Sequence, residues 1–161
     1  VTYHELGHAQ LMSMYRGETE ALCNFVYTYV RHVKFNDSFA VAFNNGMSHS
    51  SYDPDGAAVH WMITPNFRAG NEMDRTNSEY NEFRYQHRGY AKYADIVRLF
   101  GWDTFTGLYH QEHLDYEAGL FRSRWDVRAD DGLPQTDSRT LRLSVQAGCD
   151  LTPLIEVGSS K

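Results

Sequence analysis

The chain has few cysteines, no long apolar run and no excess of basic residues. Its 161 residues include only two cysteines, Cys23 and Cys149, which establish neither a disulfide nor an oxidising compartment. No apolar stretch approaches the roughly 20 residues of a membrane-spanning helix. Lys and Arg total 15 against 21 Asp and Glu, a formal charge of −6. This balance, with Arg scattered along the chain, argues against a nucleic acid or an anionic membrane as the partner.

The composition is that of one folded domain. Hydrophobic residues make up 42% of the chain and charged residues 22%, which suits a packed core rather than a disordered chain. Apolar residues recur at helical spacing in several segments, whereas evidence for strands is thin. We therefore expect a mainly α domain over residues 1–158, with a short tail at 159–161.

Six segments have the periodicity of helices. Gly17 and Gly101 are expected stops, and Thr19, Asp103 and Asp150 are expected N-caps. The predicted helices cover residues 2–15, 19–34, 89–100, 103–117, 139–147 and 151–157. Between them, residues 36–74 are rich in turn residues and 126–137 read as a polar loop. Within the first of these regions, Phe39–Phe43 fits a short helix or a strand equally well.

The first predicted helix carries the sequence His4-Glu5-Leu6-Gly7-His8, which is an H-E-x-x-H pattern. Residues four apart share one face of a helix, so both imidazoles can reach one tetrahedral ion. Zinc lowers the pKa of the water that it binds to near 7, and Glu5 can accept that proton and pass it to the leaving amine. The motif therefore predicts a catalytic zinc site.

A catalytic zinc ion needs a third protein ligand. Leu11 and Met14 stand where a metzincin would have Gly and His, so that type is excluded. Glu18 and Glu20 are both in range, and we favour Glu20, in the first turn of the next helix. Asn24 lies one turn further on the same face and can accept a hydrogen bond from a ligating histidine.

That face of the second predicted helix has two interpretations. Glu20, Asn24, Tyr27 and Arg31 fall opposite the apolar residues on a helical wheel. Alone, such a row is a solvated surface. Beside an H-E-x-x-H helix, it is better interpreted as the wall of a cleft.

These segments resemble the enhancin-like zinc metallopeptidases, family sixty of the metallopeptidases. That family has H-E-x-G-H, a variable spacer and then G-x-T-E-x-x-x-N, which is similar to His4–His8 followed by Gly17–Asn24. Two later segments, His87–Tyr93 and Ser144–Leu154, are also similar. One departure is Val157-Gly158, where a Trp-Gly pair often follows the last matched segment.

The resemblance implies a gluzincin-type site, in which His4, His8 and Glu20 bind one zinc ion and Glu5 is the catalytic base. It implies secreted or cell-surface enzymes that act on mucin-like O-glycosylated glycoproteins, often beside carbohydrate-binding modules. The family's catalytic domain also has a β-sheet before the zinc helix. This chain is therefore expected to be the C-terminal helical part of such a domain, without the upstream sheet.

Three further residues are candidates for contacts with the substrate or with the oxyanion of the tetrahedral intermediate. Tyr85, His87 and Tyr90 crowd the start of a predicted helix, although core packing or surface hydrogen bonds explain each equally well. His110 and His113 flank Glu112, and an exposed helix face explains them better than a second metal site.

The expected function is zinc-dependent endopeptidase activity, in which Glu5 assists the attack of water on a peptide carbonyl. Two alternatives stay open. One is a non-catalytic binding or channel-associated module on the same fold, and the other is a gluzincin of different specificity, such as an aminopeptidase. The intact zinc motif counts against the first, and the sequence does not decide the second.

Overall fold

The computed structural model describes residues 2–10, 19–45, 54–56, 59, 63, 86–120 and 135–157. These residues are mostly helical and contain no strand, so the predicted mainly α fold is confirmed for them. The principal elements are α1 (Thr2–Gln10), α2 (Thr19–Tyr29), η1 (Val30–Lys34), α3 (Phe39–Asn45), α6 (Gln86–Phe100), α7 (Asp103–Glu117), α8 (Gln135–Ala147) and α9 (Thr152–Val157). Within this part of the chain, none of the helices combines the length and apolar composition needed to cross a bilayer.

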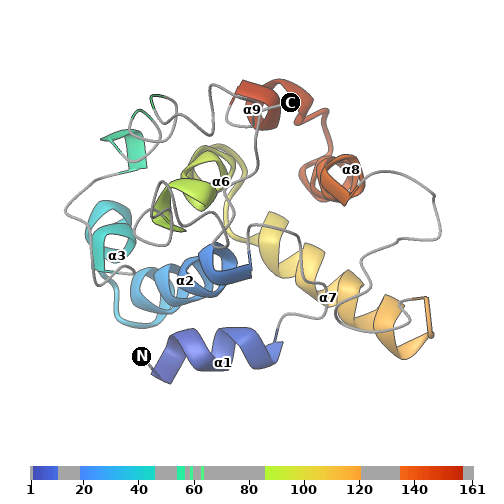
Figure 1. Ribbon diagram of the computed structural model, residues 1–161, viewed down its shortest axis with the longest axis horizontal. Helices are drawn as coiled ribbons and strands as arrows, with labels where there is room; N and C mark the ends of the chain where they lie inside the picture. The colour runs from blue at the N-terminus through green and yellow to red at the C-terminus, as the bar shows by residue number, and fades with distance from the viewer. Residues whose placement is uncertain are drawn as a thin grey trace.

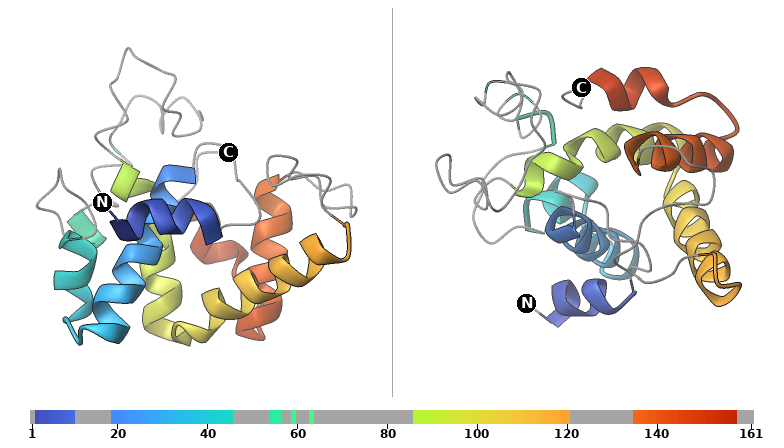
Figure 2. Two further views of the ribbon diagram at one scale, coloured as in Figure 1. Left: turned by 90° about the horizontal axis from the view of Figure 1, so that it is seen from below. Right: turned by 45° about the vertical axis from the view of Figure 1, so that its right-hand side comes forward.

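Helix α2 lies at the centre of the arrangement. One side of α2 contacts α1, and other sides contact α3 and α6 (Figure 1). Figure 2 shows α1 lying next to α2 from two further directions. The chain continues through α7, which packs against α8, while α9 packs against α6 and α8. The metal-motif helix α1 is thus placed on the core through its contact with α2.

The core forms where the apolar faces of α2, α6 and α7 meet. Phe25 of α2 lies with its ring centroid 5.0 Å from those of both Trp102 and Phe105. Tyr93 and Ile96 of α6 are almost completely buried in the same cluster. The apolar positions predicted for α2 and α6 therefore face the core, and burial of such side chains is the main stabilising contribution.

The outer end of the apolar row on α2 departs from this pattern. Val33 stands at helical spacing from Val26, Tyr29 and Val30 and is therefore expected to belong to this row, but it lies in η1 and is 43% exposed. The helix ends at Lys34 as expected, but its last turn is a π-helix rather than an α-helix. A π-helix closes its hydrogen bonds one residue later and so rotates the side chains that follow. This rotation accounts for the exposure of Val33.

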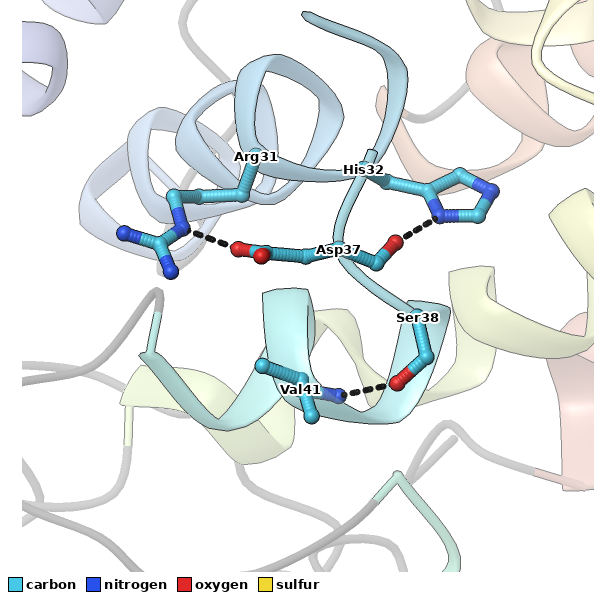
Figure 3. Close-up of polar contacts among 5 residues, drawn as sticks. All are labelled: Arg31, His32, Asp37, Ser38 and Val41. Atoms are coloured by element: carbon cyan, nitrogen blue, oxygen red, sulfur yellow. Dashed lines mark hydrogen bonds and ion pairs between the residues drawn. The ribbon is translucent and has the colours of Figure 1, made fainter. Parts of the chain in front are cut away.

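Side-chain contacts hold the chain after η1 (Figure 3). Asp37 accepts a hydrogen bond from Arg31 Nε through its carboxylate, and its carbonyl oxygen lies 2.8 Å from His32 Nδ1. Asn36 has φ 59°, in the left-handed region that Asn tolerates better than most residues. Ser38 Oγ then accepts from Val41 N at 3.4 Å, at the start of α3. The segment Phe39–Phe43 is therefore helical, which settles the choice between helix and strand.

Two predicted boundaries are wrong by about one turn. Helix α6 begins at Gln86 rather than at residue 89, and α8 begins at Gln135 rather than at 139. Residues 135–137 therefore belong to a helix and not to the polar loop predicted over 126–137. A first helical turn made of polar residues has no apolar periodicity, so the sequence pattern does not detect it.

The expected N-cap of α7 is also wrong. Asp103 is the first residue of the helix, and the capping position is Trp102, which makes no side-chain capping bond. Trp102 already has helical dihedral angles, and its carbonyl oxygen accepts from Phe105 N and Thr106 N at 3.0 Å. Its indole packs against Phe25. The capping position of α7 is thus occupied by an aromatic residue packed on the core rather than by a polar cap.

A side-chain cap from Asp150 is present at the last helix, although the N-cap position falls on Leu151, one residue later than predicted. Asp150 Oδ1 accepts a hydrogen bond from Thr152 N at 2.9 Å, and α9 begins at Thr152. This bond satisfies one of the amide groups that a helix N-terminus leaves without an intrahelical partner. The pKa of the Asp150 carboxyl group is lowered by hydrogen bonds from Thr152, chiefly from its side chain and then from its backbone amide. Gly101, with φ 78°, ends α6 as expected.

Candidate metal centre

The contact between α1 and α2 centres on Gly7, the glycine of the motif. Gly7 is buried, and a Cβ atom built on it would lie 3.1 Å from Cys23 Cα and 3.2 Å from the Cys23 carbonyl oxygen. A larger residue would push the two helices apart. Glycine therefore permits a backbone approach that brings the side chains on either side of it, His4 and His8, onto α2.

The imidazoles of His4 and His8 meet over α2. Their centroids are 4.8 Å apart, with the rings nearly perpendicular at 88°. The two Nε2 atoms face each other at 3.2 Å. Both side chains are half-buried. The helical spacing of four residues thus brings one nitrogen of each ring to a common point, as the motif predicts.

The separation of these nitrogens fits a tetrahedral zinc ion. Zinc binds imidazole nitrogen at about 2.0–2.1 Å, so two such ligands at a tetrahedral angle lie about 3.3 Å apart. The observed Nε2–Nε2 distance is 3.2 Å. Half-buried imidazoles in this geometry suit a zinc ion in donor type and in spacing.

The opposite nitrogen of each ring contacts α2. His4 Nδ1 lies 2.9 Å from Asn24 Oδ1, and His8 Nδ1 lies 3.1 Å from Cys23 Sγ. Asn24 is 7% exposed and Cys23 is completely buried. Ligating histidines generally have such a partner on the nitrogen that does not bind the metal, because it orients the ring. The hydrogen bond expected between Asn24 and a motif histidine is present in the structure.

The face of α2 that carries Asn24 is covered by α1 and is not a free surface. Tyr3 of α1 packs against Tyr27, with ring centroids 5.9 Å apart, and against Phe35 at 6.4 Å. Tyr27 and Arg31 are half-buried. Asn24 and Tyr27, in the row opposite the apolar stripe, therefore face the motif helix. At these two positions the row is a contact between helices rather than a solvated surface, and the wall of a cleft stays a prediction.

The acidic candidates differ in what the structure describes. Glu5 lies on α1 with its side chain exposed to solvent. Glu20 belongs to the first turn of α2, but its side chain lies outside the described side chains, and Glu18 lies outside the described residues altogether. Among the side chains that are described, no three His, Cys, Asp or Glu residues form a group that could hold a metal ion. The third ligand therefore stays a prediction.

The other candidates lie apart from this centre or outside the description. Tyr85 falls outside the described residues. His87 and Tyr90 lie in the first turns of α6, and their side chains are not among those described. His110 and His113 are exposed on α7, where His113 Nε2 lies 3.3 Å from Glu117 Oε1. Both histidines therefore lie on an exposed helix face, which is the explanation favoured from the sequence over a second metal site.

Sequence spacing does not assign Cys23 to the site. The sequence is consistent either with a disulfide between Cys23 and Cys149 or with two small buried thiols. In the structure both residues are thiols, and Cys23 is buried whereas Cys149 is exposed. Cys23 directly precedes Asn24, which the helical wheel did place near the motif. The wheel puts Cys23 closer to the core, and only the close approach at Gly7 brings its sulfur to His8.

Comparisons with known proteins add nothing to this geometry. Searches against protein families, curated proteins and solved structures found no match. The resemblance to the enhancin-like metallopeptidases therefore stays a prediction that depends on the motifs.

Proposed function

We propose that this chain is the metal-binding part of a zinc-dependent endopeptidase. The observation that supports this proposal best is the geometry of two imidazoles, whose Nε2 atoms converge at 3.2 Å while their Nδ1 atoms are held by α2. Two nitrogen lone pairs directed at one point would repel each other. A shared cation, or a proton between the two nitrogens, makes the arrangement favourable.

His4, His8 and Glu20 would hold the zinc ion. Glu20 is four residues before Asn24 on α2, so the two share a face of that helix, and Asn24 contacts His4. Helical spacing thus predicts that Glu20 is on the side of α2 that α1 covers. Glu18 precedes the first residue of α2, so helical spacing does not assign it to that face.

The remaining groups would carry the chemistry. A bound zinc ion would polarise the substrate carbonyl and lower the pKa of water at its open position. Glu5 follows His4 in α1, and its exposed carboxylate can accept a proton from the attacking water and donate it to the leaving amine. Asn24 holds the His4 ring in place by accepting from its Nδ1. The result is hydrolysis of a peptide bond.

The substrate class comes from the resemblance alone. On that basis the substrate is a protein or glycoprotein, in particular a mucin-like O-glycosylated one. The enzyme acts outside the cell or at its surface, and carbohydrate-binding modules accompany it elsewhere in the full-length protein. No nucleic acid is expected as a partner of an acidic chain with scattered Arg residues.

Metal analysis and two variants test the proposal. The purified folded chain should contain one zinc ion, His4→Ala should lose it, and Glu5→Gln should retain it. Hydrolysis should then be compared on a mucin and on an unglycosylated peptide, with Glu5→Gln expected to be inactive. A folded chain that takes up no zinc would instead favour the non-catalytic module, and release of single N-terminal residues would favour an aminopeptidase.

A further inference from the structure

The two motif histidines belong to a continuous row of four polar groups. Cys23 Sγ lies 3.1 Å from His8 Nδ1, His8 Nε2 lies 3.2 Å from His4 Nε2, and His4 Nδ1 lies 2.9 Å from Asn24 Oδ1. The two ends of the row differ chemically. Asn24 offers a carbonyl oxygen, which only accepts, whereas Cys23 offers a thiol, which can donate or accept.

The acceptor at Asn24 sets the tautomer of His4. Because Oδ1 cannot donate, the His4 proton resides on Nδ1, and in the neutral ring Nε2 then carries a lone pair. If His8 were in the same tautomer without a metal ion, two lone pairs would face each other at 3.2 Å. Donation from His8 Nε2–H to His4 Nε2 removes this repulsion. Nδ1 of His8 then accepts from the Cys23 thiol.

Zinc requires the opposite tautomer of His8. Both Nε2 atoms must present lone pairs to a metal ion, so the proton of His8 has to be on Nδ1. Nδ1–H then donates to Cys23 Sγ. One proton leaves Nε2 and one arrives at Nδ1 through exchange with water, the ring stays neutral, and the thiol keeps its own proton by rotating it away.

We propose that Cys23 is a positioning residue that holds the His8 ring in both tautomers, so that His8 changes tautomer when zinc binds. This inference rests on the proposed function. An acceptor-only group at this position would favour the zinc-binding tautomer alone. The thiol instead keeps the ring oriented both in the empty and in the occupied site.

The packing around Cys23 supports this role. Its side chain is completely buried, so its thiol does not contact bulk solvent. The close approach of Gly7 to Cys23 Cα, at 3.1 Å for an added Cβ, fixes the distance between the two helices at this point. The close approach of the two helix backbones therefore places the Cys23 sulfur next to the His8 imidazole.

Nitrogen-15 NMR of the histidine rings in the 161-residue chain tests the inference directly. The metal-free chain should show the His8 proton on Nε2 and the His4 proton on Nδ1. Addition of zinc should move the His8 proton to Nδ1 and leave His4 unchanged. A metal-free chain with the His8 proton already on Nδ1 would overturn the inference.

Variants of Cys23 separate a positioning role from simple packing. Cys23→Val removes the hydrogen-bonding group and should weaken zinc binding about 10- to 100-fold, as loss of a partner behind a ligating histidine does. Cys23→Ser, whose hydroxyl also donates and accepts, should restore most of the affinity and the same tautomer change. Leu22→Val, at a buried neighbour on α2, should lower stability without changing zinc affinity. Equal zinc affinities of Cys23→Val and wild type would contradict the role.

The two proposals can fail separately. A chain that binds no zinc contradicts the proposed function, but its metal-free spectrum still shows where the His8 proton resides and whether Cys23→Val moves it. A chain that binds zinc without any tautomer change keeps the proposed function and loses the role of Cys23. The wild-type spectra decide even if a variant does not fold.

Discussion

Gly7 of the zinc motif and Cys23 of α2 lie so close that a methyl group on Gly7 would be 3.1–3.3 Å from three atoms of Cys23. Two of those atoms belong to the backbone, which cannot move aside as the end of a side chain can. The distance between α1 and α2 is therefore set at this point. Both histidine contacts with α2 depend on it.

We expect Gly7→Ala to lower zinc affinity and to give no gain in stability. Alanine is favoured over glycine by about 1 kcal/mol inside a helix, but overpacking against a backbone costs about 1–3 kcal/mol. Gly107→Ala on α7 is the matched control, because a Cβ there meets chiefly the side-chain end of the exposed Gln146. Urea unfolding and zinc titration should show Gly107→Ala stabilised with unchanged affinity. A stabilised Gly7→Ala chain with full affinity would contradict the close approach.

Asn24→Ala should weaken zinc binding about 10- to 100-fold, because it removes the acceptor that orients His4. Asn24→Asp keeps an oxygen acceptor at the same place and should retain most of the affinity. Thr28→Ala serves as the control, since Thr28 is buried one turn further along α2 and donates to the Asn24 carbonyl oxygen rather than to a histidine. Competition with a chromophoric chelator measures the three affinities. Identical losses in all three variants would indicate a packing effect only.

Substitution of Glu20 and of Glu18 should affect zinc binding differently, depending on which of them is the third ligand. Glu20→Gln should remove a proposed zinc ligand. It should therefore reduce zinc affinity by more than the roughly 10- to 100-fold expected for loss of a residue that only orients a ligand. Glu18→Gln should bind zinc as the wild type does. Circular dichroism checks that both variants keep the helices. The reverse result would assign the third ligand to Glu18 and leave the rest of the site unchanged.

The cap of α9 predicts a pH dependence of stability. Hydrogen bonds from Thr152 lower the pKa of Asp150 below its ordinary value of 3.8 in the folded chain. The contribution of the ionised carboxylate is therefore present above about pH 4 and is lost as the pH falls through the lowered pKa. Asp150→Ala should be less stable than wild type at pH 7, and this difference should shrink toward pH 3. Asp150→Asn keeps an acceptor that does not titrate, and should retain part of the stability at both pH values.

The helical spacing of apolar residues predicted most of the helices and part of the core. The apolar residues of α2 and α6 recur at helical spacing, and Phe25, Tyr93 and Ile96 are indeed buried in the core. The helix N-termini were predicted less well from the sequence. Asp150 accepts an amide hydrogen bond at the start of α9 as expected, but the capping position of α7 is held by Trp102, whose indole packs against Phe25. The contact between Trp102 and Phe25 cannot be predicted from the spacing of residues along the chain.

The sequence by itself determined that His4, Glu5 and His8 follow one another around a single helix, because helical periodicity depends only on neighbours along the chain. Tertiary structure alone decided that the Cys23 sulfur lies against His8, 15 residues away. That contact requires two helices to approach at a glycine, and the distance between helices depends on all the side chains packed between them.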